Sequence, residues 1–145
     1  MAGEDKYLYE QFVDKIRDLK NNGYKQGLEK AKNSGDLKAI VKNLQYYNNS
    51  VFMDVGEAGS EELKNNFVLQ GESVGYVVGL LDSKLKELFS NDEVLVLFKT
   101  LLKKIKGTRG LSRGYAKILE KVSGLSETGD MFIDKKLLLF KQRTK

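Results

Sequence analysis

The chain of 145 residues contains no proline. Average usage, near 5%, would give about seven. Each proline inside a helix removes a backbone hydrogen bond and breaks or kinks the helix, so a chain without proline is free to form long, uninterrupted helices. Apolar residues recur at spacings of three and four along most of the sequence, which is the period of an amphipathic helix. The sequence therefore predicts a mostly α fold, a helical bundle that forms a single domain over residues 1–145.

The expected helices follow from this periodicity and from capping residues. Asn21-Asn22-Gly23 is interpreted as a stop after the first helix, and Ser90-x-x-Glu93 matches a capping box that begins the fifth. Residues 48–59 are expected to be a loop. Residues 131–140 fit a small C-terminal β-hairpin or one last helix, and the hairpin is favoured. The helices are expected at 5–21, 24–32, 37–48, 61–89, 92–106 and 112–123.

The composition excludes several kinds of chemistry. The sequence has no His, Cys or Trp, so it cannot supply a thiol nucleophile, a disulfide, a Cys/His zinc site or a Ser-His-Asp triad. It also has no Gly-x4-Gly-Lys-Ser/Thr phosphate loop. The acidic residues Asp54, Glu57, Glu61 and Glu62 lie near an expected helix start, where the helix dipole favours negative charge. We therefore expect no catalytic activity, no metal and no cofactor.

The sequence also indicates where the protein works. Its first residues are charged and have no apolar segment behind them, so no signal peptide is expected. The longest apolar runs, such as Val94–Phe98, have five residues, far fewer than the roughly 20 that span a membrane. We expect a cytoplasmic protein with no membrane association.

Charge is distributed unevenly along the chain, whose net charge is +5. Residues 1–98 carry 12 basic and 16 acidic residues, a net charge of −4. Residues 99–145 carry 13 basic and 4 acidic residues, a net charge of +9. This asymmetry predicts an acidic part that forms the core and a basic part that faces a polyanion.

The basic residues of the second part recur at helical spacing on two consecutive expected helices, and Arg109 lies in the loop between them. If the two helices pack as a hairpin, these cations merge into one surface. Such a surface is predicted to bind the phosphate backbone of nucleic acid. The candidate residues are Lys99, Lys103, Lys104, Lys106, Arg109, Arg113, Lys117 and Lys121.

Two known DNA- or RNA-binding arrangements resemble this region. Gly107-x-x-Gly110, with a basic centre between two helical segments, is similar to the GXXG loop of KH domains, which implies contact with a single-stranded backbone. The helices over 61–89, 92–106 and 112–123, followed by 131–140 as a wing, are instead similar to a winged helix. That resemblance implies a regulator of duplex DNA with 112–123 as its recognition helix.

A stripe of glycines lies inside the longest expected helix. Gly71, Gly75 and Gly79 are spaced four residues apart and border its apolar face. Each glycine in a helix interior costs about 0.5–1 kcal/mol relative to alanine, and close approach of another helix compensates for that cost. The stripe is therefore predicted to be a tight helix crossing or a contact with a protein partner or a second copy of the chain.

A third resemblance covers residues 63–124. The segments Phe67-Val-Leu-Gln-Gly71-Glu-Ser-Val-Gly75, Leu102-Lys-Lys-Ile105 and Gly110-Leu111 are similar to the helical small subunits of CRISPR effector complexes. The resemblance implies non-catalytic support of a nucleic-acid strand within a larger complex. The sequence thus predicts a nucleic-acid-binding subunit, with RNA or a single strand favoured over duplex DNA. The alternatives are a winged-helix regulator and a helical protein-interaction subunit that uses the glycine stripe.

Overall fold

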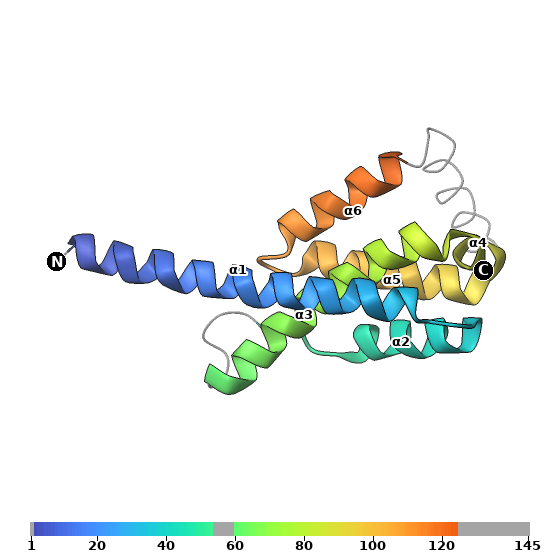
Figure 1. Ribbon diagram of the computed structural model, residues 1–145, viewed down its shortest axis with the longest axis horizontal. Helices are drawn as coiled ribbons and strands as arrows, with labels where there is room; N and C mark the ends of the chain where they lie inside the picture. Colours follow the sequence, from blue (N-terminus) through green and yellow to red (C-terminus); the bar gives the residue numbers. More distant parts are fainter. Residues whose placement is uncertain (1, 54–59, 125–145) are drawn as a thin grey trace.

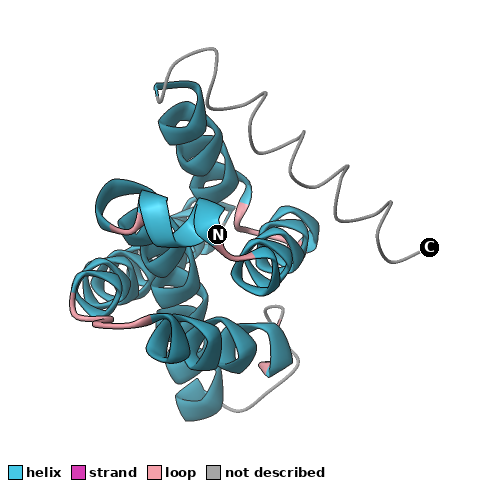
Figure 2. Cartoon of the chain, turned by 90° about the vertical axis from the view of Figure 1, so that its right-hand side faces the viewer, coloured by secondary structure: helices cyan, strands magenta, loops and turns pink. Residues whose placement is uncertain are grey.

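The described part of the computed structural model comprises residues 2–53 and 60–124, and every regular element within it is a helix (Figures 1 and 2). The expectation of a mostly α protein is confirmed there, whereas residues 131–140, the expected hairpin or helix, lie outside the described residues. None of the described helices is long and apolar enough to cross a membrane. The helices are α1 (Ala2–Lys32), α2 (Leu37–Asn49), α3 (Ser60–Ser83), α4 (Leu85–Ser90), α5 (Asp92–Gly107) and α6 (Ser112–Gly124).

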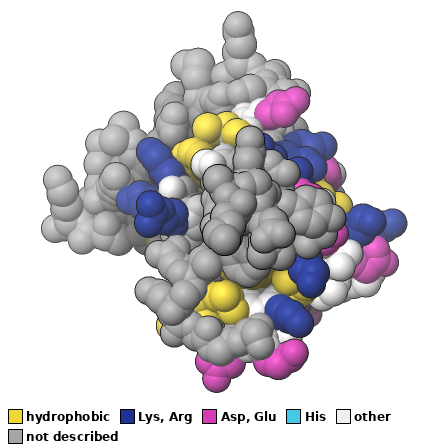
Figure 3. Space-filling model, turned by 90° about the vertical axis from the view of Figure 1, so that its left-hand side faces the viewer, with side chains coloured by type: hydrophobic (Ala, Val, Ile, Leu, Met, Phe, Trp, Pro, Cys, Tyr) yellow, Lys and Arg dark blue, Asp and Glu magenta, His cyan; other side chains and the backbone are white. Residues whose placement is uncertain are grey.

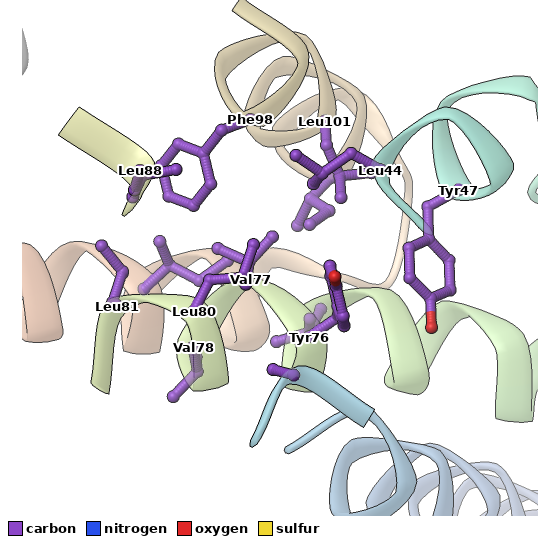
Figure 4. Packing of buried hydrophobic residues seen from close by; sticks show 14 of the residues in the cluster. Leu44, Tyr47, Tyr76, Val77, Val78, Leu80, Leu81, Leu88, Phe98 and Leu101 are labelled. Atoms are coloured by element: carbon purple, nitrogen blue, oxygen red, sulfur yellow. The ribbon is translucent and has the colours of Figure 1, made fainter. Parts of the chain in front are cut away.

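Helix α3 is the centre of the fold. From Ser73 to Leu81 every residue is buried, because α1, α2, α4, α5 and α6 surround this segment. Its residues Tyr76, Val77 and Leu80 pack toward side chains of α2, α4 and α5, which Figure 4 shows at close range. The sequence predicts one amphipathic face for 61–89, whereas the segment 73–81 of α3 is buried around its whole circumference.

Helix α1 is one continuous helix of 31 residues, so the predicted stop at Asn21-Asn22-Gly23 is wrong. It runs in the same direction as α3, which crosses it obliquely, and it extends beyond α3 at the N-terminal end (Figure 1). Gly23 and Gly27 lie inside α1 and face the backbone of α3. A Cβ atom at Gly23 would overlap the carbonyl oxygen of Val68, and one at Gly27 would overlap that of Glu72. Tertiary packing has overridden the low helix propensity of glycine.

The glycine stripe of α3 forms the other side of this contact. A Cβ atom at Gly71 would overlap the carbonyl oxygen of Lys20, and one at Gly75 would overlap that of Tyr24. At Gly79 it would lie 2.5 Å from the Cβ atom of Ala31. The two backbones thus touch through small residues on both helices, the arrangement described for small-xxx-small motifs. The stripe packs within the chain, and α1 covers the face that a partner would otherwise use.

Two other helix boundaries follow from local hydrogen bonds. The predicted helix over 61–89 is interrupted at Lys84. In the residue before this break, the hydroxyl of Ser83 donates a hydrogen bond to the carbonyl oxygen of Gly79 at 2.7 Å. Such bonds bend helices, and here the chain turns into the short helix α4. Helix α5 begins where the sequence predicts, but its cap is Asn91 rather than Ser90. The Asn91 side chain accepts a hydrogen bond from the backbone of Val94 at 3.1 Å.

Helix α2 is held at its start and along its buried face. The carboxylate of Asp36 accepts a hydrogen bond from the backbone of Ala39 at 2.8 Å, which caps the N-terminus of the helix. The hydroxyl of Tyr76 on α3 lies 3.0 Å from the Ser34 hydroxyl and accepts from the Asn43 amide at 3.3 Å. This buried polar contact joins α2 and α3 to the turn that follows α1.

The glycine contact makes a testable prediction. We expect Gly75→Ala to lower the free energy of unfolding by about 2 kcal/mol or more, because the added methyl group forces α1 and α3 apart. Gly107→Ala is the matched control, since no atom lies within 4 Å of a Cβ atom there. We expect that control to change stability by about 0.5 kcal/mol, in the stabilising direction. Urea unfolding of both variants measures the difference, and equal stabilities would contradict the packing.

Candidate nucleic-acid interface

Lys104, one of the predicted binding residues, closes the C-terminal end of α2. Its ammonium group donates to the carbonyl oxygens of Tyr47 and Asn48, each at 3.0 Å, and to that of Ser50. It also lies 4.6 Å from the centre of the Phe52 ring. The last carbonyls of a helix carry the negative end of its dipole, so a cation there is stabilising. Partial burial lowers the pKa of Lys104. Lys104 therefore links α5 to α2, and its ammonium group is directed at the end of α2 instead of at a ligand.

Lys121 is also engaged within the molecule. Its ammonium group donates to the carboxylate of Asp82 at 2.8 Å, which joins α6 to the end of α3. This hydrogen bond and the negative charge of Asp82 raise the pKa of Lys121. The carboxylate offsets part of the attraction that Lys121 would offer to a phosphate. The predicted surface of eight merged cations is therefore not formed as a whole.

The other three lysines of α5 differ in their surroundings. Lys103 is exposed on α5, beside Lys104 in sequence. Lys106 lies 5.9 Å from the centre of the Tyr115 ring on α6, and Lys99 is half-buried on α5. Where Figure 3 shows described residues, the basic side chains form separate groups with hydrophobic and acidic ones between them.

The loop between α5 and α6 is tied to α1. Gly110 has a φ of +88°, a conformation that L side chains rarely adopt, and its carbonyl oxygen accepts a hydrogen bond from Lys20 at 2.9 Å. The neighbouring Thr108 hydroxyl donates to the carbonyl oxygen of Lys104 at 2.6 Å. The Gly107-x-x-Gly110 segment is thus the turn between α5 and α6, as the sequence places it between two helical segments.

A pocket of about 470 Å³ opens between α1, α3, the α5–α6 loop and α6. Its lining combines apolar residues with four cations, and no acidic residue is among the described residues that line it. The apolar side chains are Val13, Ile16, Val74 and Leu111, and the cations are Arg17, Lys20, Arg113 and Lys117.

The cations lie on both sides of this pocket. Arg17 and Lys20 belong to α1, whereas Arg113 and Lys117 belong to α6. Arg109 is exposed in the α5–α6 loop, beside Gly110 and just before the N-terminus of α6. We name these five residues the α1–α6 cation cluster. Three of them, all from the α5–α6 loop and α6, were predicted from the sequence.

Two lysines of the cluster are held in place by neighbours. Lys117 lies 4.2 Å from the centre of the Tyr24 ring, a cation–π contact between α6 and α1. Lys20 lies 5.4 Å from the centre of the Phe67 ring in addition to its hydrogen bond with Gly110. Burial lowers the pKa of Lys20. Its ammonium group has three donors, so the bond to Gly110 leaves two for a ligand.

Arg17 has only a weak internal partner. Its guanidinium lies 3.9 Å from the Asp14 carboxylate, and both side chains are more than half exposed. Exposed pairs of this kind contribute between zero and about 1 kcal/mol. Within the described part of the chain, no carboxylate pairs with Arg109 or Arg113. These three arginines can therefore form bidentate hydrogen bonds with an anion.

Sequence reasoning missed Arg17 and Lys20 because they belong to the net-acidic part. The signal for them is nevertheless present. Arg17 and Lys20 are three residues apart and share one face of the helix predicted over 5–21. Tyr24 joins that face only if the helix continues through Gly23, and the predicted stop at that glycine separated Tyr24 from them.

The described residues contain no group of three or more His, Cys, Asp or Glu side chains that could hold a metal ion. Comparison of the chain with protein-family models, with curated proteins and with solved structures found no match in any of the three.

The two neighbouring lysines of α5 offer a test of these assignments. We expect Lys104→Met to lower the free energy of unfolding by about 1–2 kcal/mol, because it removes hydrogen bonds from a charged donor to the end of α2. Lys103→Met should leave stability unchanged within about 0.5 kcal/mol, as expected for an exposed site. Chemical denaturation of both variants provides the measurement. Equal effects would show that Lys104 has no structural role.

Proposed function

We propose that the protein binds the sugar-phosphate backbone of nucleic acid, without catalysis, through the α1–α6 cation cluster. The observation that carries the proposal is that cations from two helices, more than 90 residues apart in sequence, flank one pocket, and that no acidic side chain is among its described lining residues. Gathering like charges costs folding free energy, and a polyanion relieves that cost. Binding also releases the counterions that surround the nucleic acid.

The arginines of the cluster suit the geometry of a phosphate group. Arg17, Arg109 and Arg113 are exposed. The planar guanidinium presents paired donors that match two phosphate oxygens. Lys20 and Lys117 add positive charge at positions fixed by their contacts within the protein. Together they supply both geometry and charge for successive phosphates of a strand.

The proposal places the protein as a subunit of a nucleoprotein complex, as its resemblance to helical CRISPR small subunits implies. The α5 lysines Lys99, Lys103 and Lys106 stay predictions from the sequence and are not needed for it. The interaction-subunit alternative has less support, because α1 covers Gly71, Gly75 and Gly79.

The winged-helix alternative is supported by the exposure of α6. This helix diverges from the rest of the bundle in Figure 1, and its Leu119 is 48% exposed. The proposed wing, residues 131–140, lies outside the described residues. A preference for duplex DNA in the experiment below would favour this alternative.

A pair of matched double variants tests the proposal. Arg113→Gln with Lys117→Gln removes two positive charges from the cluster, and Lys38→Gln with Lys42→Gln removes two exposed charges from α2. For a single-stranded oligonucleotide, we expect the first pair to reduce the slope of log K against log[salt] by about 1.4, since each lost phosphate contact removes about 0.7. The second pair should leave the slope unchanged.

The measurement is fluorescence anisotropy over a series of salt concentrations, with circular dichroism as a check that both variants keep their helices. Equal reductions for the two pairs would show that only overall charge matters. No binding by the unaltered protein would refute the proposal directly.

A further inference from the structure

The pocket between the cations has an apolar floor that phosphate binding does not explain. Val74 and Leu111 are buried beneath it, and Val13 and Ile16 are half-buried along its α1 side. A site that holds only phosphate needs charge and hydrogen-bond donors, and it gains nothing from aliphatic side chains. The volume of about 470 Å³ falls within the range of pockets that hold small organic ligands.

The positions of the cations indicate how a strand would cross this floor. Arg17 lies on α1 on one side and Arg113 on α6 on the other, and the ammonium groups of Lys20 and Lys117 reach between the two sides, to the Gly110 carbonyl and the Tyr24 ring. A strand that crosses from one side to the other can place a phosphate at each rim. The nucleotide between those phosphates then lies over the apolar floor.

Only an unpaired nucleotide fits this arrangement. A duplex keeps its bases stacked inside and presents phosphates, sugars and groove edges, whereas a single strand can turn a base outward into a protein pocket. We propose that this pocket receives one unstacked base of a single-stranded nucleic acid, while the α1–α6 cation cluster holds the phosphates on either side. This inference rests on the proposed function and adds to it the strandedness of the ligand.

Polar groups at the pocket can contact the edge of such a base. Asn21 lines the pocket and is exposed, and its amide provides both a donor and an acceptor. Tyr24 also lines it, but Lys117 lies against the face of its ring. We therefore expect the base to contact the aliphatic floor and Asn21 rather than to stack on that face of Tyr24.

The experiment fills the pocket without changing its charge. Ile16→Trp places a larger side chain in the floor and keeps every cation. Leu119→Trp adds the same side chain on α6 at an exposed residue that does not line the pocket. Each protein is titrated with a thymidine pentanucleotide that carries 2-aminopurine at its centre, excited where tryptophan does not absorb, and with a blunt duplex.

For the unaltered protein and Leu119→Trp, we expect the 2-aminopurine emission to change on binding as the base leaves its stacked neighbours. We expect Ile16→Trp to bind the pentanucleotide roughly tenfold more weakly, because one base loses its apolar contacts with the floor. The unaltered protein is expected to bind the duplex more weakly than the pentanucleotide, and Ile16→Trp should bind the duplex as strongly as the unaltered protein does. If Ile16→Trp does not fold, Val13→Trp gives the same test from the outer end of the floor.

The outcomes separate this inference from the proposed function. If Ile16→Trp binds the pentanucleotide within about twofold of the unaltered protein and the emission does not change, the base pocket is refuted, whereas the cation cluster stands. If Arg113→Gln with Lys117→Gln has no effect on binding, both proposals fail. If free adenosine monophosphate competes as well as the pentanucleotide, the pocket serves a free nucleotide and the strand is refuted.

Discussion

The contact between the backbones of α1 and α3 determines most of the structure. Small residues face each other on both helices, so the two backbones approach until their atoms touch and gain dispersion contacts along several turns. Because α1 occupies only this narrow stripe, the rest of the circumference of α3 is left for α2, α4, α5 and α6. The same contact positions the candidate interface. Helix α6 packs on α3, where a Cβ atom at Gly114 would lie 3.0 Å from the Val74 side chain, so α3 sets the distance between the cations of α1 and those of α6.

The sequence predicted the helices whose boundaries are decided locally. The helices expected over 37–48, 92–106 and 112–123 have clear amphipathic faces and polar residues at their starts, and the structure moves their boundaries by only one residue. The failure at Gly23 has a different cause. Glycine favours helix ends by local propensity, but here the absence of a Cβ atom is what allows α3 to approach. The stripe of α3 was recognised, but its partner was not, because Gly23 of α1 was interpreted as part of a stop that divided the helix before Gly27.

The candidate site could be predicted only in part, because the helical face of a lysine does not determine its partner. Lys103 and Lys104 are adjacent and look equivalent in the sequence. Yet one is exposed and the other reaches carbonyl groups at the end of α2, which lie more than 50 residues away in the chain. Lys121 finds Asp82 in the same way. Arg17 shows the opposite case. It belongs to the net-acidic part of the sequence and was not predicted to bind, yet tertiary packing brings it to the same pocket as the cations of α6.

The contacts of Lys20 and Lys117 have a consequence for how tightly a ligand can be held. A free lysine side chain loses about 1.5–2 kcal/mol of rotamer entropy when it is fixed. Here the hydrogen bond to Gly110 and the ring of Tyr24 already restrict these two side chains, so much of that loss occurs when the chain folds and not when a ligand associates. Arg113 makes no such contact with the described residues and keeps its freedom. The rim therefore combines a preorganised part, which selects ligands by the spacing of their charges, with an adaptable part, which adjusts to them.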